Sequence, residues 1–404
     1  SRWTTVVTRP EDVHTAFSLE AAFDEAPLLE VKDLCIEFER HGEVNVVDHV
    51  SFKVRPGETM GLVGESGCGK SITALTIMGL IDPKATITGE ILYQGEDLLS
   101  KSIEERRAML GHEMAMIYQD ALSSLNPAML IKAQMKQLTS RGGTRSAEEL
   151  LDLVGLDPKR TLESYPHELS GGQRQRVLIA MALTRDPKLI IADEPTTALD
   201  VTVQKQVIAL LNELREKLGF AMIFVSHDLA LVAEVAHHIT VMYAGQVIEQ
   251  APTKELLTHP THEYTRGLLG AVLSIESGSG RLHQVPGTVP SPKDFPSGDR
   301  FAPRSSHPGV GGDVRPVMRR VEGSWHFYAD HPEGYAAIAA AAVSTAIAIP
   351  SAANPDRTPN ASPASAPGLG LARDEGAANG VGRVRDENAA PEDGRPTLKT
   401  EEEK

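Results

Sequence analysis

A short glycine-rich segment has the residue types and spacing needed to hold phosphate groups. Residues 64–71 are Gly-Glu-Ser-Gly-Cys-Gly-Lys-Ser, which fits the pattern G-x-x-x-x-G-K-[ST]. Glycines let the backbone wrap tightly, so that successive N–H groups point at phosphate oxygens, and the helix that follows adds the positive end of its dipole. Lys70 would reach the β- and γ-phosphates, and the Ser71 hydroxyl would bind Mg²⁺. The residues expected to contact nucleotide in and beside this phosphate-binding loop are Gly64, Ser66, Gly67, Cys68, Gly69, Lys70, Ser71 and Ile72.

Two carboxylates follow an apolar run farther along the chain. Residues 189–192 are Leu-Ile-Ile-Ala, and Asp193 and Glu194 come directly after them. Asp193 would bind Mg²⁺ through water, across from Ser71, while Glu194 would polarise the attacking water as a general base. Acidic residues after a strand are by themselves more typical of a solvated strand end, and a glycine loop can occur by chance. The strand expected before residues 64–71 and the helix expected after them favour a nucleotide-hydrolysing site.

A second glycine pair predicts another anion-binding site. Residues 169–173 are Leu-Ser-Gly-Gly-Gln and precede an alanine-rich helical pattern. Ser170 is suited to cap that helix, and the two glycines leave backbone N–H groups bare. One γ-phosphate cannot easily meet both glycine loops of one monomer. We therefore expect Ser170 and Gly172 to reach a nucleotide that a partner subunit holds.

Apolar runs and helical patterns alternate around these motifs. This alternation indicates an α/β architecture with a largely parallel core sheet. Residues 103–183 are mostly helical in pattern, with few strand-like runs. The strands expected in the core are 59–63, 189–192, 220–225 and the hairpin 239–243 with 246–249, and the clearest helices are 70–80 and 201–218.

The motifs in this order resemble the nucleotide-binding subunit of an ATP-binding cassette (ABC) transporter. The resemblance rests on the phosphate-binding loop, the strand that ends at Asp193 and Glu194, and the LSGGQ signature at 169–173. It implies the fold of a P-loop NTPase of the ABC cassette type: a RecA-like core, an antiparallel β subdomain and a helical signature subdomain, here followed by an irregular C-terminal extension.

The resemblance also implies roles for single residues. Gln119 matches the glutamine that contacts Mg²⁺ and the attacking water, and His227 matches the histidine that contacts the γ-phosphate. Phe38 would stack on adenine. The implied catalytic residues are Lys70, Gln119, Glu194 and His227, the implied Mg²⁺ ligands are Ser71, Gln119 and Asp193, and the implied contacts to nucleotide across the interface are Ser170, Gly171, Gly172, Gln173 and Asp200.

Several phrases resemble one branch of this family, the ATPases of oligopeptide, dipeptide and nickel importers. They occur at 118–120, 124–127, 165–168, 192–204 and 262–269, and the last lies outside the expected catalytic core. The branch implies a second ABC ATPase subunit, two transmembrane permease subunits and an extracytoplasmic substrate-binding protein. The chain would lie peripherally at the cytoplasmic face of the cell membrane. A peptide is the expected cargo, with nickel, opines, glutathione and oligosaccharides as alternatives.

The cysteines depart from that branch, which often carries four cysteines after the core for an iron–sulfur cluster. This chain has only Cys35 and Cys68. Asp299, Ser305 and Asp330 stand where the resemblance leads us to expect cysteine. We therefore expect ATP and Mg²⁺ but no iron–sulfur cluster.

The net charge of the chain disfavours one of the alternative functions. The 404 residues include 40 Lys and Arg against 55 Asp and Glu, a net charge of −15. A protein that grips phosphate backbones usually has a basic surplus, so a soluble ABC ATPase that acts on nucleic acid or ribosomes is disfavoured. No run of 18 apolar residues is present, so we expect no membrane span. A regulator that binds ATP without hydrolysing it is disfavoured because the catalytic residues are intact.

The domain organisation follows from these patterns. We expect an N-terminal extension at 1–27 and an ABC ATPase domain at 28–275, with its helical subdomain at about 100–183. A C-terminal extension of the peptide-importer type is expected at 276–334. Residues 335–404 are rich in Ala, Pro and Gly and are expected to be a disordered tail, because they contain too little apolar surface to offset the entropy of ordering.

Overall fold

The computed structural model describes residues 25–119, 121–277, 285–308 and 310–338. All of these residues belong to a compact unit that spans 1–349. Most of the predicted N-terminal extension and nearly all of the predicted tail lie outside the described residues.

Strands from both sides of the phosphate-binding loop in the chain form a small antiparallel sheet. Its strand order is β2-β1-β4-β5. The regular alternation of buried and exposed residues along β2 shows that one face of this sheet covers the core. The bounds of its strands are β1 Leu29–Glu37, β2 Asn45–Val54, β4 Thr86–Tyr93 and β5 Glu96–Asp97.

The central sheet has eight strands in the order β11-β12-β10-β9-β3-β8-β7-β6. The strands β6, β7, β8, β3 and β9 run parallel to one another, and β10, β12 and β11 each pair in antiparallel fashion. Their bounds are β3 Thr59–Val63, β6 Met114–Ile117, β7 Leu189–Asp193, β8 Ala221–Ser226, β9 His238–Tyr243, β10 Gln246–Pro252, β11 Val317–Arg320 and β12 Phe327–Asp330.

The parallel strands are apolar because both of their faces are covered. Every residue of β3 and β8 is buried. Since parallel strands end at the same edge of a sheet, β3, β7 and β8 deliver the phosphate-binding loop, the carboxylates 193–194 and His227 to one edge. The predicted α/β architecture is confirmed.

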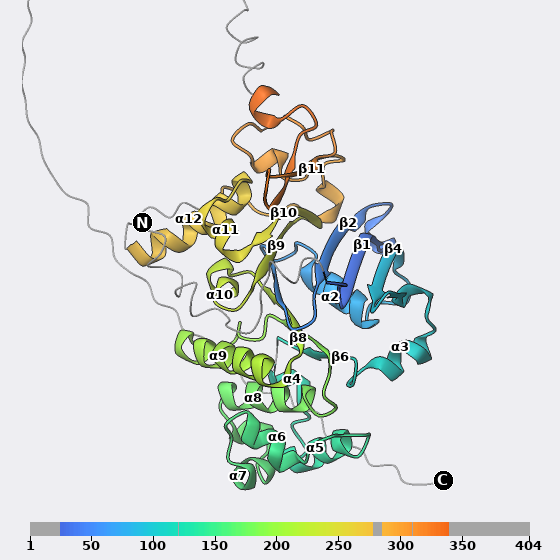
Figure 1. The fold of residues 1–404 in the computed structure, drawn as a ribbon, viewed down its shortest axis with the longest axis vertical. Coiled ribbons are helices and arrows are strands. Elements are labelled where there is room, and N and C mark those ends of the chain that lie inside the picture. Colours follow the sequence, from blue (N-terminus) through green and yellow to red (C-terminus); the bar gives the residue numbers. More distant parts are fainter. Residues whose placement is uncertain (1–24, 120, 278–284, 309, 339–404) are drawn as a thin grey trace, which may run out of the picture. The chain divides into compact units, whose positions relative to one another are not determined.

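Helices α5 to α8 pack on one another at the bottom of the view in Figure 1, whereas β11 lies near the top. Serine and aspartate N-caps begin several helices of this chain, such as Ser146 at α6 and Asp157 at α7. None of the described helices is both long and apolar enough to span a membrane. The helix bounds are α2 Lys70–Met78, α3 Ile103–Met109, α4 Ala121–Ser124, α5 Ile131–Thr139, α6 Ala147–Leu153, α7 Pro158–Leu162, α8 Gly171–Ala182, α9 Val201–Leu218, α10 Leu229–Ala233, α11 Thr253–Thr258 and α12 Glu263–Ser277.

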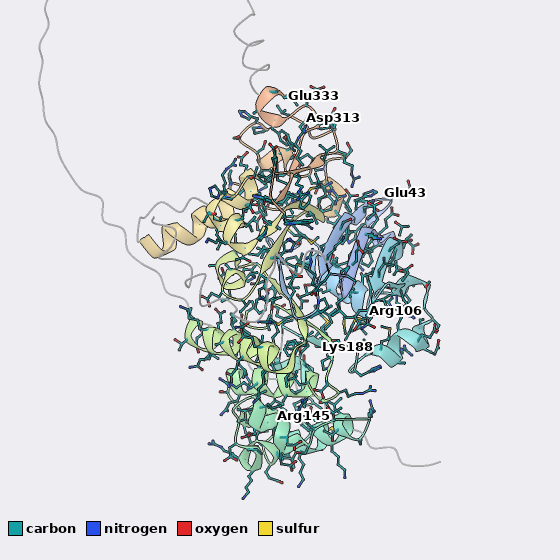
Figure 2. All side chains as sticks on the ribbon, viewed as in Figure 1. Glu43, Arg106, Arg145, Lys188, Asp313 and Glu333 are labelled. Carbon is teal, nitrogen blue, oxygen red and sulfur yellow. The ribbon has the colours of Figure 1, made fainter. Side chains whose placement is uncertain are left out.

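Strand β6 lies within the segment predicted to be mostly helical. It pairs with β7 and forms an edge of the central sheet. Just before the two strands, Lys188 Nζ and Glu113 Oε1 form an ion pair at 3.1 Å, and Lys188 is labelled in Figure 2. Four apolar residues are too few for periodicity to separate a strand from a helix, so only the pairing identifies β6. The helical subdomain therefore begins after this strand of the core.

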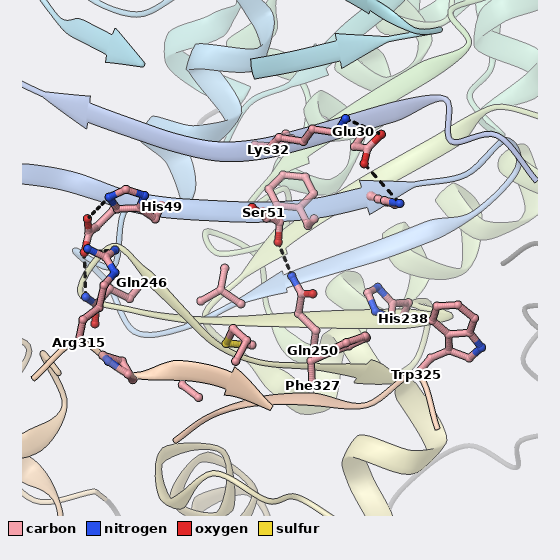
Figure 3. A pocket seen from close by; sticks show the side chains of 18 of the residues that line it. Glu30, Lys32, His49, Ser51, His238, Gln246, Gln250, Arg315, Trp325 and Phe327 are labelled. Atoms are coloured by element: carbon pink, nitrogen blue, oxygen red, sulfur yellow. Dashed lines mark hydrogen bonds and ion pairs between the residues drawn. The ribbon is translucent and has the colours of Figure 1, made fainter. Parts of the chain in front are cut away.

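The C-terminal extension also contributes strands that the sequence patterns did not indicate. Strand β12 pairs with β10, and β11 pairs with β12. A groove of about 550 Å³ separates this hairpin from β1 and β2 (Figure 3). The extension also contacts the small sheet, because the Arg300 guanidinium donates to the Asn45 carbonyl of β2 at 2.7 Å. The extension is therefore joined to both sheets rather than to the end of the domain alone.

Candidate functional site

The phosphate-binding loop joins β3 to α2 and makes close backbone contacts. A Cβ atom on Gly64 would lie 2.2 Å from the carbonyl oxygen of Met242, so no larger residue fits there. Gly69 has φ of +85°, in the left-handed region that favours glycine, and it immediately precedes α2. Ser66 and Gly67 lie at the exposed tip, whereas Cys68 is buried beneath it. The strand–loop–helix context predicted for a phosphate site is present.

Lys70 lies under the loop with only 4% of its surface exposed. Its Nζ donates to the carbonyl oxygens of Gly64 at 2.6 Å and Glu65 at 2.9 Å. Burial lowers the pKa of the ammonium, although nearby acidic groups oppose this shift. Lys70 therefore stabilises the conformation of the loop and places a positive charge beneath it.

Ser71 and Asp193 meet at the edge of the sheet, although 122 positions separate them in the chain. The Ser71 hydroxyl donates to Asp193 Oδ1 at 3.0 Å. Burial raises the pKa of Asp193, and the hydrogen bond from Ser71 partly offsets this effect. A hydroxyl and a carboxylate oxygen are the hard ligands that Mg²⁺ prefers, so this pair fits the predicted ion.

Gln119 follows β6 at the same edge of the sheet, and its side chain is exposed. Its predicted contacts with Mg²⁺ and water stay predictions. Ile72 is half-buried on the first turn of α2.

Glu194 is held in place by two side chains. Its Oε2 accepts a hydrogen bond from the Thr197 hydroxyl at 2.9 Å and lies 3.2 Å from His227 Nδ1. The backbone of Glu194 has φ of +46°, which is uncommon for a residue other than glycine and concentrates at functional sites. The hydrogen bond to His227 lowers the pKa of Glu194 despite partial burial, and the same bond raises the pKa of His227. Thr197 is a residue that sequence reasoning missed.

The His227 pKa provides a direct test of this pair. We expect Glu194→Gln to lower the pKa of His227 toward its ordinary value of 6.5, because the neutral amide no longer favours the imidazolium. In the wild type the pair is intact above the lowered pKa of Glu194 and is lost as the pH rises through the raised pKa of His227. Titration of the His227 ring by NMR measures both variants.

Thr197→Val is the matched control for that titration. It removes the other hydrogen bond to Glu194 but leaves the carboxylate charge. The raised pKa of His227 should persist in this variant. An unchanged His227 pKa in Glu194→Gln would contradict the pairing.

The signature segment forms the start of α8. Ser170 and Gln173 make a capping box, in which the Gln173 N–H donates to Ser170 Oγ at 3.2 Å and the Ser170 N–H donates to Gln173 Oε1 at 2.9 Å. The first N–H groups of α8 have no acceptor within the helix. A Cβ atom on Gly172 would lie 2.6 Å from the Val203 side chain, and one on Gly171 would approach Leu199.

Asp200 is the N-cap of α9, because its side chain accepts a hydrogen bond from the Val203 N–H at 3.0 Å. Helices α8 and α2 lie well apart in Figure 1. Among the described residues, the structure therefore does not bring the signature to the phosphate-binding loop of the same chain.

Phe38 is only 6% exposed. The guanidinium of Arg40 lies 4.5 Å from the centre of its ring, and the ring of His41 is nearly perpendicular to it, with the two centroids 6.3 Å apart. One face of the aromatic ring is thus covered by a cation in this conformation. The predicted stacking of Phe38 on adenine stays a prediction.

The family described as "ABC transporter" matches residues 47–197, and the family described as "Oligopeptide/dipeptide transporter, C-terminal region" matches residues 248–308. The oligopeptide transport ATP-binding protein OppD of Bacillus subtilis is 44% identical over 324 residues, which are 76% of this chain and 90% of OppD. The dipeptide transport ATP-binding protein DppD of Escherichia coli is 47% identical over 287 residues, 69% of this chain and 88% of DppD.

A solved structure supports the fold. The protein cbiO1 from Clostridium perfringens, described as part of the ABC transporter complex cbiONQ, has a TM-score of 0.51 with 24% sequence identity. The similarity covers 58% of this chain and 92% of cbiO1.

Proposed function

This chain belongs to the ABC transporter family of ATP-binding proteins, and we propose that it hydrolyses ATP to energise the import of oligopeptides or dipeptides. The match of residues 248–308 to the C-terminal region of oligopeptide and dipeptide transporters carries this proposal. That segment lies outside the cluster of Lys70, Ser71, Asp193 and Glu194, so it is informative about the branch rather than about ATP.

The site residues suggest how ATP is held and hydrolysed. The N–H groups of the phosphate-binding loop and the Lys70 ammonium bind the β- and γ-phosphates. Mg²⁺ held by Ser71 and Asp193 would supply charge that neutralises the phosphate oxygens. Glu194, kept ionised by His227 and Thr197, accepts a proton from the attacking water. The raised pKa of His227 favours its cationic form, which suits a position beside the γ-phosphate.

A second ATPase subunit completes this arrangement. The start of α8 presents backbone N–H groups to a nucleotide on the partner, and the partner returns its own signature to this chain's phosphate-binding loop. We propose that this pair docks beneath two transmembrane permease subunits, at the cytoplasmic face of the membrane. An extracytoplasmic protein would deliver the peptide.

Purification of the full-length chain from membranes of its own cells tests the proposal. We expect two permeases and a second ABC ATPase to copurify with it. In proteoliposomes supplied with the binding protein, short peptides should stimulate ATP hydrolysis. Stimulation by nickel, an opine, glutathione or an oligosaccharide instead would reassign the cargo. Copurification with ribosomes or nucleic acid, without permeases, would contradict the transport role.

We also propose that the extension holds no iron–sulfur cluster. Asp299 accepts hydrogen bonds from the Phe301 N–H at 2.9 Å and from the Tyr335 hydroxyl. Asp330 accepts from the Tyr335 N–H at 3.0 Å and pairs with Arg319 at 2.9 Å. Carboxylates engaged in this way do not supply the thiolates that such a cluster requires.

Analysis of the purified protein for iron and acid-labile sulfide checks this point. We expect both to be far below one equivalent per chain. Stoichiometric iron and sulfide would overturn the proposal.

A further inference from the structure

The C-terminal extension reaches the back of the phosphate-binding loop. We propose that Arg304 of the extension is a positioning residue that acts through Glu65 to set the shape of this loop, and with it the affinity for ATP. The inference rests on the proposed ATP-binding function. It adds a direct link between the extension and the nucleotide site.

Arg304 and Glu65 form a two-pronged ion pair. The Nη1 atom of Arg304 lies 2.6 Å from Glu65 Oε2, and its Nη2 lies 3.2 Å from Oε1. The Arg304 side chain is only 6% exposed. A planar guanidinium that meets both carboxylate oxygens fixes orientation as well as distance.

The remaining donors of Arg304 hold it to its own extension. Its Nε donates to the Pro286 carbonyl at 2.8 Å, and Nη2 donates to the carbonyls of Val285 at 3.1 Å and Gly287 at 3.0 Å. A lysine has no matching fork of donors and could not make these contacts together. Arg304 therefore connects Glu65 to the segment 285–287.

Glu65 transmits this contact to the catalytic lysine. Its backbone N–H donates to the hydroxyl of Tyr264, a fully buried residue of α12, at 2.9 Å. Its carbonyl accepts from Lys70 Nζ at 2.9 Å. The side chain and N–H of Glu65 are thus held by residues beyond the catalytic core, while its carbonyl holds the ammonium that we assign to the phosphates.

Arg300, four residues before Arg304, supports the other end of the loop. Its guanidinium donates to the carbonyls of Ala244 at 2.6 Å and Asn45 at 2.7 Å. Gly245, which follows Ala244 in the chain, donates its N–H to the Cys68 carbonyl at 3.0 Å. The loop is therefore supported at residue 65 and at residue 68 by arginines of the same short segment.

Arg300 also contacts the small sheet, through Asp48 of β2. Arg300 Nη2 lies 3.7 Å from Asp48 Oδ2, and Arg315 Nη2 lies 3.0 Å from the same oxygen. The Gln246 amide donates to Asp48 at 2.8 Å, and Gln246 is labelled at one end of the groove in Figure 3. Burial would raise the pKa of Asp48, but the Gln246 bond and the arginines lower it overall. The segment that contains Arg304 is thus held against the small sheet.

Arg304→Gln tests the inference, with Arg319→Gln as its matched control. Both variants remove one arginine–carboxylate pair and bonds to backbone carbonyls within the extension, but Arg319 pairs with Asp330 rather than with the loop. Calorimetry with MgATP on the full chain should show a Kd about tenfold higher for Arg304→Gln, a size typical of coupling between sites. The Kd of Arg319→Gln should stay within about twofold of the wild type.

The melting temperature of the nucleotide-free variants separates positioning from general damage. Arg304→Gln should melt at the lower temperature, because Arg304 is 6% exposed and Arg319 is 40% exposed, so both Kd values are compared well below the lower of the two melting temperatures. Equal Kd values for Arg304→Gln and Arg319→Gln would overturn the inference while leaving the proposed function intact. A wild-type chain that binds no MgATP would instead overturn the proposed function and the inference together.

Glu65→Gln provides a second route if Arg304→Gln does not fold. This variant should also raise the Kd for MgATP, because the neutral amide loses the ion pair with Arg304. The double variant should bind MgATP no more weakly than either single variant, as expected for residues that act through one contact. Independent effects that multiply in the double variant would overturn the route through Glu65.

Discussion

Glu194→Gln should bind MgATP with near wild-type affinity and hydrolyse it at least 100-fold more slowly. The amide keeps the shape of the side chain and can still accept a hydrogen bond from Thr197, but it cannot take a proton from water. General-base catalysis contributes about 10²–10⁴-fold to rates, which sets the size of the expected loss. The position of Glu194 at the end of β7, between Thr197 and His227, is the structural basis for this expectation.

Phosphate release by the assembled complex measures turnover, and binding of labelled ATP measures affinity. Glu213→Gln is the control, because it removes one carboxylate from the exposed face of α9, away from the site. It should leave both quantities unchanged. Hydrolysis by Glu194→Gln at a rate near that of the wild type would contradict its assignment as the base.

Lys70→Met should raise the Kd for MgATP by about 100-fold or more. The thioether chain keeps roughly the length of lysine but donates no hydrogen bond. A hydrogen bond from a charged group contributes about 1.5–3 kcal/mol, and each 1.4 kcal/mol corresponds to a factor of ten in affinity. Gly64 and Glu65 leave one N–H of the ammonium for a phosphate oxygen, and a bond at the upper end of this range accounts for the expected loss.

Lys70→Met should also lower the melting temperature of the nucleotide-free chain. Without the ammonium, the carbonyls of Gly64 and Glu65 lose their donor. Lys84→Met, at an exposed position beyond α2, removes the same charge and should change neither property. A Kd for Lys70→Met within about fivefold of the wild type would contradict the role of Lys70.

Several elements could be predicted closely from the sequence because their patterns are local. The helix expected at 201–218 is α9, with the same bounds, and the run 59–63 is β3. The hairpin turn at 244–245 lies between β9 and β10 as expected. Each of these elements carries its own periodicity or turn residues, so its identity does not depend on distant partners.

Other elements could not be predicted because pairing across the sheet decides them. Strand β6 is four residues of apolar sequence that become a strand only beside β7. Strands β11 and β12 have four residues each, too few to show a regular alternation, and they join the central sheet through β10. Strands β6 and β12 pair with segments more than 70 positions away, so the local sequence gives little sign of them, and β11 pairs in turn with β12.

The candidate site divides in the same way. The chemistry of the site could be predicted because its residues stand in short local motifs. These are the phosphate-binding loop, the signature, the pair Asp193 and Glu194, and His227 directly after a strand. The sequence by itself therefore determined the family, the reaction and the residues that we assign to it.

Only the tertiary structure decided how those residues are supported. The contacts of Glu65 with Tyr264 and Arg304 span 199 and 239 positions, and nothing in the local sequence around Glu65 indicates them. The physical reason is that chemical groups are set by residue type, whereas their positions are set by which distant surfaces pack together.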